Sequence, residues 1–204
     1  MRILYLGPEH ESILRFLREY PKTLGDIGDD VDRTEEKLDP ESLRAMGYDF
    51  IVSYRYRYLV KKPVLDLFPD RVINLHISYL PWNRGADPNL WSFVDNTPKG
   101  VTIHYMDEGL DTGDIILQKE VIFDPYREKT LKTTYERLSL AMEQLFYQAW
   151  PSIRAGKNDR KEQVGYGSAH RAVDKHAIEH RLTRGYDTLV TELASSALVS
   201  EERL

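Results

Sequence analysis

The sequence predicts an α/β fold: a Rossmann-like, mostly parallel, twisted sheet with helices on both faces and a short C-terminal extension. Three short apolar runs, at residues 2–7, 49–54 and 71–76, have the length and composition of buried strands. Helical segments alternate with them, which is typical of a parallel sheet built from βαβ units. The composition becomes polar beyond residue 154. We therefore expect a main domain over residues 1–154 and an extension over residues 155–204 that packs on its core.

The remaining elements follow from the same reasoning. Residues 9–20 carry apolar side chains at helical spacing, and a proline opens a short helix expected over residues 62–68. Residues 101–107 and 116–123 are interpreted as two further strands that run antiparallel to each other. The longest helix is expected over residues 128–153. Its apolar side chains recur at helical spacing and are assigned to the core: Leu131, Tyr135, Leu138, Met142, Leu145, Phe146 and Trp150.

Composition excludes several classes of protein. The chain has 204 residues, of which 41% are hydrophobic and 30% charged, as is typical of one sizeable globular domain. It contains no cysteine, so disulfides, thiolate metal sites and a cysteine nucleophile are excluded. The net charge of −5 disfavours a surface that coats nucleic acid, and no apolar stretch approaches a membrane span. We expect a cytoplasmic protein with neither a nucleic-acid nor a membrane partner.

Charge is spread unevenly along the chain. Residues 26–41 contain eight acids and two bases, whereas residues 154–184 contain eight bases and four acids. Both segments can be solvated faces. The basic segment can also lie near an anionic substrate.

The stretch NLHISYLPWNRGADPNLW places an Asn and a His at the end of a strand. Asn74 and His76 are two residues apart, so both side chains lie on one face of the strand expected over residues 71–76. In an open parallel sheet, ligands bind outside the carboxyl ends of the strands. Two buried polar side chains at that point either satisfy each other within the fold or serve a site.

A second polar element favours the site. The loop DEGLDTGDII, at residues 107–116, carries Asp111 between two glycines. Carboxylates in such loops often form local turns. Together with Asn74 and His76, however, Asp111 completes a set suited to acyl transfer. The Asn can donate to a developing oxyanion, the His can move protons, and the Asp can hold the His charged and accept a proton.

These motifs resemble those of the formyltransferase family, which includes methionyl-tRNA, glycinamide ribonucleotide and sugar N-formyltransferases. The resemblance runs from about residue 49 to residue 123. It is carried by Asn74-Leu-His76-x-Ser78-x-Leu80-Pro81, Arg84-Gly85-x-x-Pro88, Gly100-Val-Thr102 and Leu110-Asp111-Thr112-Gly113-Asp114. It implies transfer of a formyl group from 10-formyltetrahydrofolate to an amine, without a metal. It also implies that Asn74, His76 and Asp111 are catalytic.

The resemblance places the folate against two loops. The backbone around Arg57, Tyr58 and Leu59, in the stretch YRYRYLV, would bind the pterin ring. The loop that contains Asp107, Glu108 and Leu110 would contribute from the other side. Arg55 departs from the family pattern, because a small residue or glycine is common near that position.

The acceptor amine is expected to belong to a nucleotide-linked amino sugar. Trp82, Asn83 and Arg84 offer an aromatic face, an amide and a guanidinium as acceptor contacts; for Trp82, a role as a loop anchor packed on the core is equally open. Glu9 and Glu11 stand where glycinamide ribonucleotide enzymes bind a phosphate, and they would repel it. The residues after 154 are too few for the additional domain that holds tRNA in methionyl-tRNA enzymes. Another small amine stays open as acceptor, and a homodimer is expected from similar proteins.

A rival hypothesis comes from the stretch HAIEH. His176 and His180 match a pattern found in zinc peptidases and would share a face of an α-helix. No third ligand stands out, so we expect no metal and treat a zinc hydrolase as the remote alternative.

Overall fold

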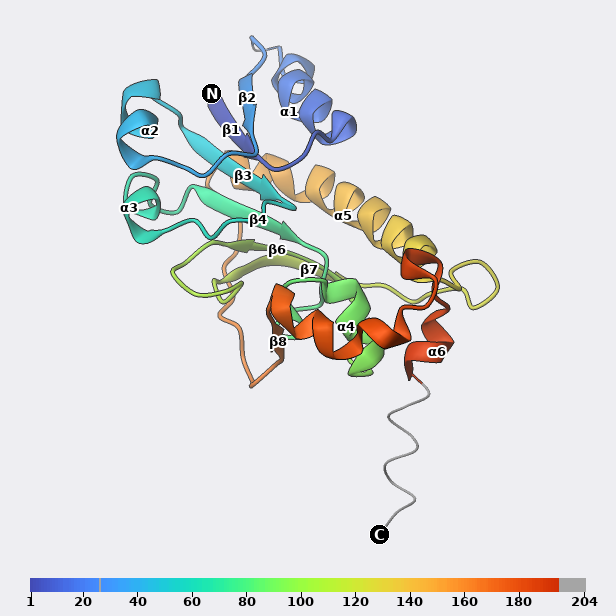
Figure 1. Cartoon of the computed structure of the whole chain (residues 1–204). Helices are drawn as coiled ribbons and strands as arrows, with labels where there is room; N and C mark the ends of the chain where they lie inside the picture. Colours follow the sequence, from blue (N-terminus) through green and yellow to red (C-terminus); the bar gives the residue numbers. More distant parts are fainter. Residues whose placement is uncertain (26, 195–204) are drawn as a thin grey trace. The chain divides into compact units, whose positions relative to one another are not determined.

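The computed structural model describes residues 1–25 and 27–194, and it contains a six-stranded sheet in the order β2-β1-β3-β4-β6-β7 (Figure 1). The strands are β1 (Arg2–Leu6), β2 (Asp30–Thr34), β3 (Phe50–Tyr54), β4 (Val72–His76), β6 (Gly100–Tyr105) and β7 (Ile115–Glu120). The pairs β1–β2, β1–β3 and β3–β4 are parallel. The predicted α/β, mostly parallel fold is therefore confirmed.

The strands β6 and β7 run antiparallel, as expected. The N–H of Tyr105 donates to the carbonyl of Asp114 at one end of the pair. The N–H of Val121 donates to the carbonyl of Lys99 at the other end. Residue numbers rise along one strand as they fall along the other, which defines an antiparallel ladder.

The chain divides into two compact units. Among the described residues, the first comprises residues 1–76, 103–117 and 146–162, and the second comprises residues 77–102, 118–145 and 163–194. The extension expected from residue 155 is therefore shared between the units in the described part of the chain. Its residues 195–204 lie outside the described residues.

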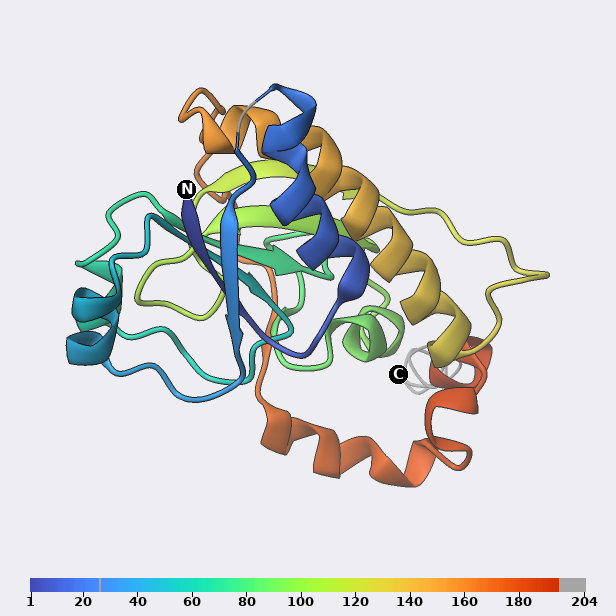
Figure 2. The same cartoon turned by 90° about the horizontal axis from the view of Figure 1, so that it is seen from above.

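Helices cover both faces of the sheet in the first unit. On one face, α1 (Glu11–Thr23) lies beside the C-terminal part of α5 (Leu131–Arg154), as Figure 2 shows. The rings of Phe16 and Phe146 meet there edge to face, with centroids 5.8 Å apart. On the other face, α2 (Pro40–Met46) and α3 (Lys62–Leu65) bury Leu43 and Val64 against apolar side chains of β1, β3 and β4. Burial of these side chains is the main stabilising term of the unit.

Two of these elements, β2 and α2, were not expected from the sequence. The strand DVDRT buries only Val31, and its acids gave the segment the appearance of a solvated face. The helix α2 does carry the usual signals. Asp39 accepts a hydrogen bond from the N–H of Ser42, Pro40 opens the helix, and Gly47 ends it with a φ of 65°.

The second unit has its own small core. The helix α4 (Pro88–Val94) packs against α6 (Val190–Ala194), and Leu90, Phe93 and Leu193 form an apolar cluster with Leu131. A two-stranded parallel pair joins β5 (Arg84–Gly85) to β8 (Ala169–His170). Two 3₁₀ segments, Ala172–Arg181 and Gly185–Asp187, lead to α6. No helix among the described residues is long and apolar enough to cross a membrane.

Half of the eight basic residues at positions 154–184 are paired with a carboxylate of their own unit. Four of them form ion pairs with carboxylates, in the pairs Arg154–Asp29, Arg160–Asp70, Lys175–Asp87 and Arg184–Glu192. Arg160 also pairs with Asp114. The excess of bases in the sequence therefore does not translate into an equal excess of free positive charge.

The pair formed by Asp29 and Arg154 is buried and yields a stability prediction. The side chain of Asp29 is fully buried and accepts from Arg154 Nε at 3.1 Å and Nη2 at 2.9 Å. Burial raises the pKa of Asp29, but the hydrogen bonds and charges of Arg154 and the N-terminal ammonium outweigh it, so the pKa lies below its ordinary value of 3.8. We expect Asp29→Asn to lower the free energy of unfolding by about 3–5 kcal/mol, because Arg154 is left without its counter-charge.

Urea unfolding at neutral pH measures this loss. The folded-state pKa is depressed, so the carboxylate stabilises the fold above pH 3.8 and loses that effect as the pH falls below it. The difference between wild type and variant should therefore shrink in acid. The matched control is Asp30→Asn, whose side chain is 70% exposed and pairs with Arg2, and it should cost under about 1 kcal/mol. Equal losses in the two variants would contradict this account.

Candidate active site

The strand β4 presents two polar side chains at its carboxyl end. Asn74 lies beside Ser53 of β3 in the sheet register, and His76 is the last residue of the strand. His76 is only 7% exposed, and the residues on either side of it in the chain are buried and apolar. His76 is buried and Asn74 is half-buried, and both need partners, since burying an unsatisfied amide or imidazole is costly.

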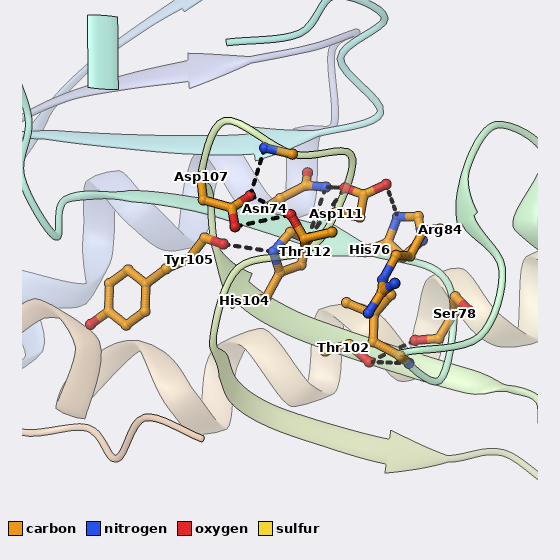
Figure 3. A network of polar contacts seen from close by, with 12 residues as sticks. Asn74, His76, Ser78, Arg84, Thr102, His104, Tyr105, Asp107, Asp111 and Thr112 are labelled. Atoms are coloured by element: carbon orange, nitrogen blue, oxygen red, sulfur yellow. Dashed lines mark hydrogen bonds and ion pairs between the residues drawn. The ribbon is translucent and has the colours of Figure 1, made fainter. Parts of the chain in front are cut away.

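Asp111 supplies the partner. It lies in the loop between β6 and β7 with a φ of 52°, a left-handed conformation that Asp tolerates better than most residues. Asn74 Nδ2 donates to Asp111 Oδ1 at 3.0 Å. His76 Nδ1 lies 3.6 Å from Asp111 Oδ2, within ion-pair distance but beyond a hydrogen bond. Figure 3 shows the three side chains pointing toward one another. The structure thus brings together the three residues singled out in the sequence.

A fourth member, His104 of β6, was missed by the sequence reasoning. Its Nε2 lies 3.4 Å from both Asp111 Oδ1 and Asn74 Nδ2. Its Nδ1 lies 2.7 Å from the carbonyl of Tyr105, which can only accept, so Nδ1 carries a hydrogen. A neutral His104 therefore presents a lone pair to the amide of Asn74, and a protonated one presents a donor to Asp111. The signal available in the sequence was the polar alternation of Thr102 and His104 in an otherwise apolar strand.

The loop that carries Asp111 is held by its own side chains. Asp107 accepts from the N–H of Gly109 at 3.0 Å and from the hydroxyl of Thr112 at 2.7 Å (Figure 3). Gly113 passes so close to the β6 backbone that a Cβ there would lie 1.9 Å from the carbonyl oxygen of Tyr105. The carboxylate of Asp107, expected to contact folate, is thus also used to shape the loop. Glu108 is exposed and lies 3.9 Å from Lys62, while Leu110 is half-buried.

The stretch expected to bind the pterin ring follows β3 without regular secondary structure. The backbone N–H and C=O groups of Arg57, Tyr58 and Leu59 make no hydrogen bond to any residue that the structure describes. The side chain of Leu59 is 61% exposed. Free backbone groups beside an apolar side chain suit a flat, polar-edged ring, so the residues present fit a pterin.

Arg55 adopts a backbone conformation that favours glycine, although it is an arginine. Its φ of 61° places it in the left-handed region, where a residue without a Cβ is favoured. The chain therefore has an arginine at a turn whose backbone conformation suits glycine. The side chain of Arg55 is exposed and so adds no steric conflict inside the unit.

Gly7 lies against the backbone where this stretch begins, at Tyr54. It has a φ of 131°, and a Cβ there would lie 2.0 Å from the carbonyl oxygen of Tyr54. We expect Gly7→Ala to cost about 3 kcal/mol of unfolding free energy and to weaken tetrahydrofolate binding, because the backbone after Tyr54 must move. Chemical denaturation and calorimetric titration measure the two effects. Gly47→Ala is the matched control, since Gly47 is also left-handed but has nothing within 4 Å, and it should cost only about 1 kcal/mol with folate binding intact.

The residues expected to contact the acceptor lie in the second unit and differ in exposure. Trp82 and Arg84 are half-buried. Asn83 is completely buried, and its Nδ2 donates to the hydroxyl of Thr97 at 2.7 Å while its Oδ1 accepts from Ser168 at 3.2 Å. The amide of Asn83 is therefore occupied in fixing the loop. Trp82 and Arg84 stay the predicted acceptor contacts.

The two histidines of HAIEH lie in a 3₁₀ segment instead of an α-helix. At three residues per turn, side chains four apart point about 120° away from each other. His176 and His180 are both exposed, and no group of three potential metal ligands occurs among the described residues. The geometry gives the zinc hypothesis no support.

Comparison with known proteins identifies a family and structures of the same fold. The sequence model described as "Formyl transferase" matches residues 30–150. The crystal structure of the formyltransferase PseJ from Anoxybacillus kamchatkensis, in complex with UDP-4,6-dideoxy-4-formamido-L-AltNAc and tetrahydrofolate, superposes with a TM-score of 0.84. It is 49% identical, over 95% of this chain and 97% of that one. A sugar N-formyltransferase from Shewanella has a TM-score of 0.71 and 22% identity, over 87% of this chain and 79% of that one, which shows the shared fold.

Similarity in sequence also extends to longer enzymes. The methionyl-tRNA formyltransferase of Geotalea daltonii is 37% identical over 124 residues, which make up 60% of this chain and 39% of that protein. The chain thus spans about two fifths of the length of this curated relative. The matched residues 30–150 include Asn74, His76, His104 and Asp111. This chain belongs to the formyl transferase family.

Proposed function

We propose that the chain transfers a formyl group from 10-formyltetrahydrofolate to the amino group of a nucleotide-linked amino sugar. The observation that carries the reaction is the cluster of Asn74, His76 and Asp111, in which one carboxylate contacts both an amide and an imidazole. Membership of the formyl transferase family supports the reaction type. The 49% identity to PseJ, a protein that binds a UDP-linked formamido sugar and tetrahydrofolate, supports the acceptor class.

The reaction makes two demands on the protein. The neutral amine attacks the formyl carbon, the new C–N bond forms, and the carbonyl oxygen becomes an oxyanion. The bond from that carbon to the folate nitrogen then breaks, so one proton leaves the amine and one reaches the folate nitrogen. The protein must stabilise the oxyanion and move these protons, and it needs no covalent intermediate.

The cluster can meet both demands. The amide of Asn74 and a protonated His76 are hydrogen-bond donors suited to the oxyanion. The carboxylate of Asp111 favours the protonated form of His76 and can accept the amine proton, directly or through water. His104, 3.4 Å from Asp111 and from Asn74, would hold these two groups in place.

The co-substrate supplies the formyl carbon, and the residues proposed to hold it lie in the same unit as the cluster. The free backbone groups of Arg57, Tyr58 and Leu59 would bind the edge of the pterin ring. The backbone of Glu108 and the side chain of Leu110 would contribute from the loop that carries Asp111. Asp107 would act mainly by keeping that loop in shape.

Other acceptors are distinguished by experiment. The identity to a methionyl-tRNA formyltransferase keeps that acceptor as the second candidate. Glycinamide ribonucleotide is disfavoured because the exposed Glu9 and the acidic first turn of α1, with Glu11, would repel its phosphate. A cytoplasmic location, a homodimer and the lack of a nucleic-acid partner stay predictions.

The test is a panel of amines with 10-formyltetrahydrofolate as donor. UDP-linked and dTDP-linked amino sugars, methionyl-tRNA and glycinamide ribonucleotide are compared by kcat/KM and by the mass of one added formyl group. We expect a nucleotide-linked amino sugar to have the highest kcat/KM. A preference for methionyl-tRNA or glycinamide ribonucleotide would overturn the acceptor and leave the reaction type standing.

A further inference from the structure

The backbone at Arg84 is fixed by contacts within the second unit. Arg84 pairs with Ala169 in the β5–β8 ladder, and its N–H donates to the carbonyl of Ser168 at 2.9 Å. The preceding residue, Asn83, is completely buried and bonded to Thr97. Arg84 thus projects from a point where the chain has little freedom, as a binding residue should.

The guanidinium of Arg84 is oriented by a neutral amide. Gln163 Oε1 accepts from Arg84 Nε at 3.0 Å and from Nη2 at 2.8 Å. One oxygen thereby occupies one edge of the guanidinium and fixes its plane. Two of the five N–H donors are used, and those of Nη1 stay available.

The charge of Arg84 is not neutralised within the described part of the chain. No carboxylate there forms an ion pair with it, in contrast to Lys175, whose ammonium lies 3.3 Å from Asp87. The other acid nearby in the sequence, Asp95, is bonded to His170 at 2.7 Å. A cation that is oriented but still carries its full charge is suited to a phosphate, which arginine binds through paired hydrogen bonds.

We propose that Arg84 binds the diphosphate of the acceptor and that Gln163 is a positioning residue for it. This inference rests on the proposed function, and it adds which residues recognise the anionic part of the substrate. Gln163 is a suitable orienting group because it accepts two hydrogen bonds without adding charge. A glutamate at this position would give the same geometry but would cancel the charge that the phosphate needs.

The test is the affinity for UDP, measured by titration calorimetry, with tetrahydrofolate as the second ligand. Gln163→Glu keeps the size of the side chain and is expected to weaken UDP binding by about tenfold or more, because charge-assisted hydrogen bonds are lost. Tetrahydrofolate affinity should stay unchanged. The matched control is Gln144→Glu, the same change on the exposed surface of α5, which should leave both affinities unaltered.

A double-mutant cycle separates positioning from general damage to the fold. Arg84→Gln should also weaken UDP binding by about tenfold or more, and Gln163→Ala by less, because the cation remains but is no longer held in one plane. In the Arg84→Gln background, Gln163→Ala should cause no further loss, since it acts only through Arg84. Thermal unfolding of each variant checks that it folds. If Gln163→Glu does not fold, Gln163→Ala takes its place in the test.

Three results would overturn the inference. If wild type binds UDP and Gln163→Glu and Arg84→Gln bind it equally well, the roles of Arg84 and Gln163 are wrong while the proposed function stands. If wild type binds neither UDP nor dTDP, the nucleotide-linked acceptor fails and this inference falls with it. Loss of turnover without loss of UDP affinity would also contradict it.

Discussion

Asp111→Asn is expected to lower turnover by on the order of 100- to 10,000-fold, the range typical of a lost general base. Asparagine has nearly the same shape and tolerates the left-handed conformation that Asp111 adopts, so the loop should keep its course. What changes is the charge 3.6 Å from His76 and the acceptor for the amine proton. Steady-state kinetics with the preferred acceptor measure the effect, and tetrahydrofolate affinity should change little.

The control for Asp111 lies three residues along the same loop. Asp114 is partly exposed and pairs with Arg160 at 3.1 Å. Asp114→Asn removes the same charge from the loop and should change turnover by less than about threefold, since an exposed pair contributes little. If Asp111→Asn and Asp114→Asn had similar kinetics, Asp111 would have no special role.

The second large effect concerns His76. Because it is proposed to stabilise the oxyanion, His76→Ala should lower kcat and kcat/KM together by about 100- to 1000-fold. The KM for the folate donor should stay close to that of wild type, since the pterin contacts are assigned to the backbone of other residues.

His180→Ala is the control that also tests the zinc alternative. His180 is exposed in the 3₁₀ segment, so its removal should leave turnover unchanged, and metal chelators should have no effect on activity. Activity that required His180 but survived His76→Ala would reverse the assignment. A selective rise in donor KM with an unchanged kcat in His76→Ala would show a binding role in place of a catalytic one.

Much of the site could be predicted because its signals are local. Asn74 and His76 are two residues apart on one strand, and Asp111 lies in a loop that its glycines reveal. The mostly parallel sheet followed from apolar runs that alternate with helices. These features depend on residues close in sequence, where periodicity and turn chemistry are informative.

What escaped prediction depends on contacts between distant residues. The role of His104 appears only when β6 is placed beside β4, and a strand's neighbours cannot be derived from its own pattern. Asn83 is buried and hydrogen-bonded to Ser168, which lies 85 residues away, so its position in a polar loop suggested an exposure that it does not have. The strand β2 has one buried apolar residue and is defined by pairing with β1.

The most direct test of formyl transfer by this cluster is the fate of a labelled formyl carbon. With donor carrying ¹³C in the formyl group and a UDP-linked amino sugar, we expect wild type to produce a ¹³C-labelled formamide on the sugar. Asp111→Asn should bind tetrahydrofolate normally and produce almost none of this product. A labelled formamide formed at equal rates by both proteins, or none formed from any amine by a wild-type protein that binds the donor, would contradict the account.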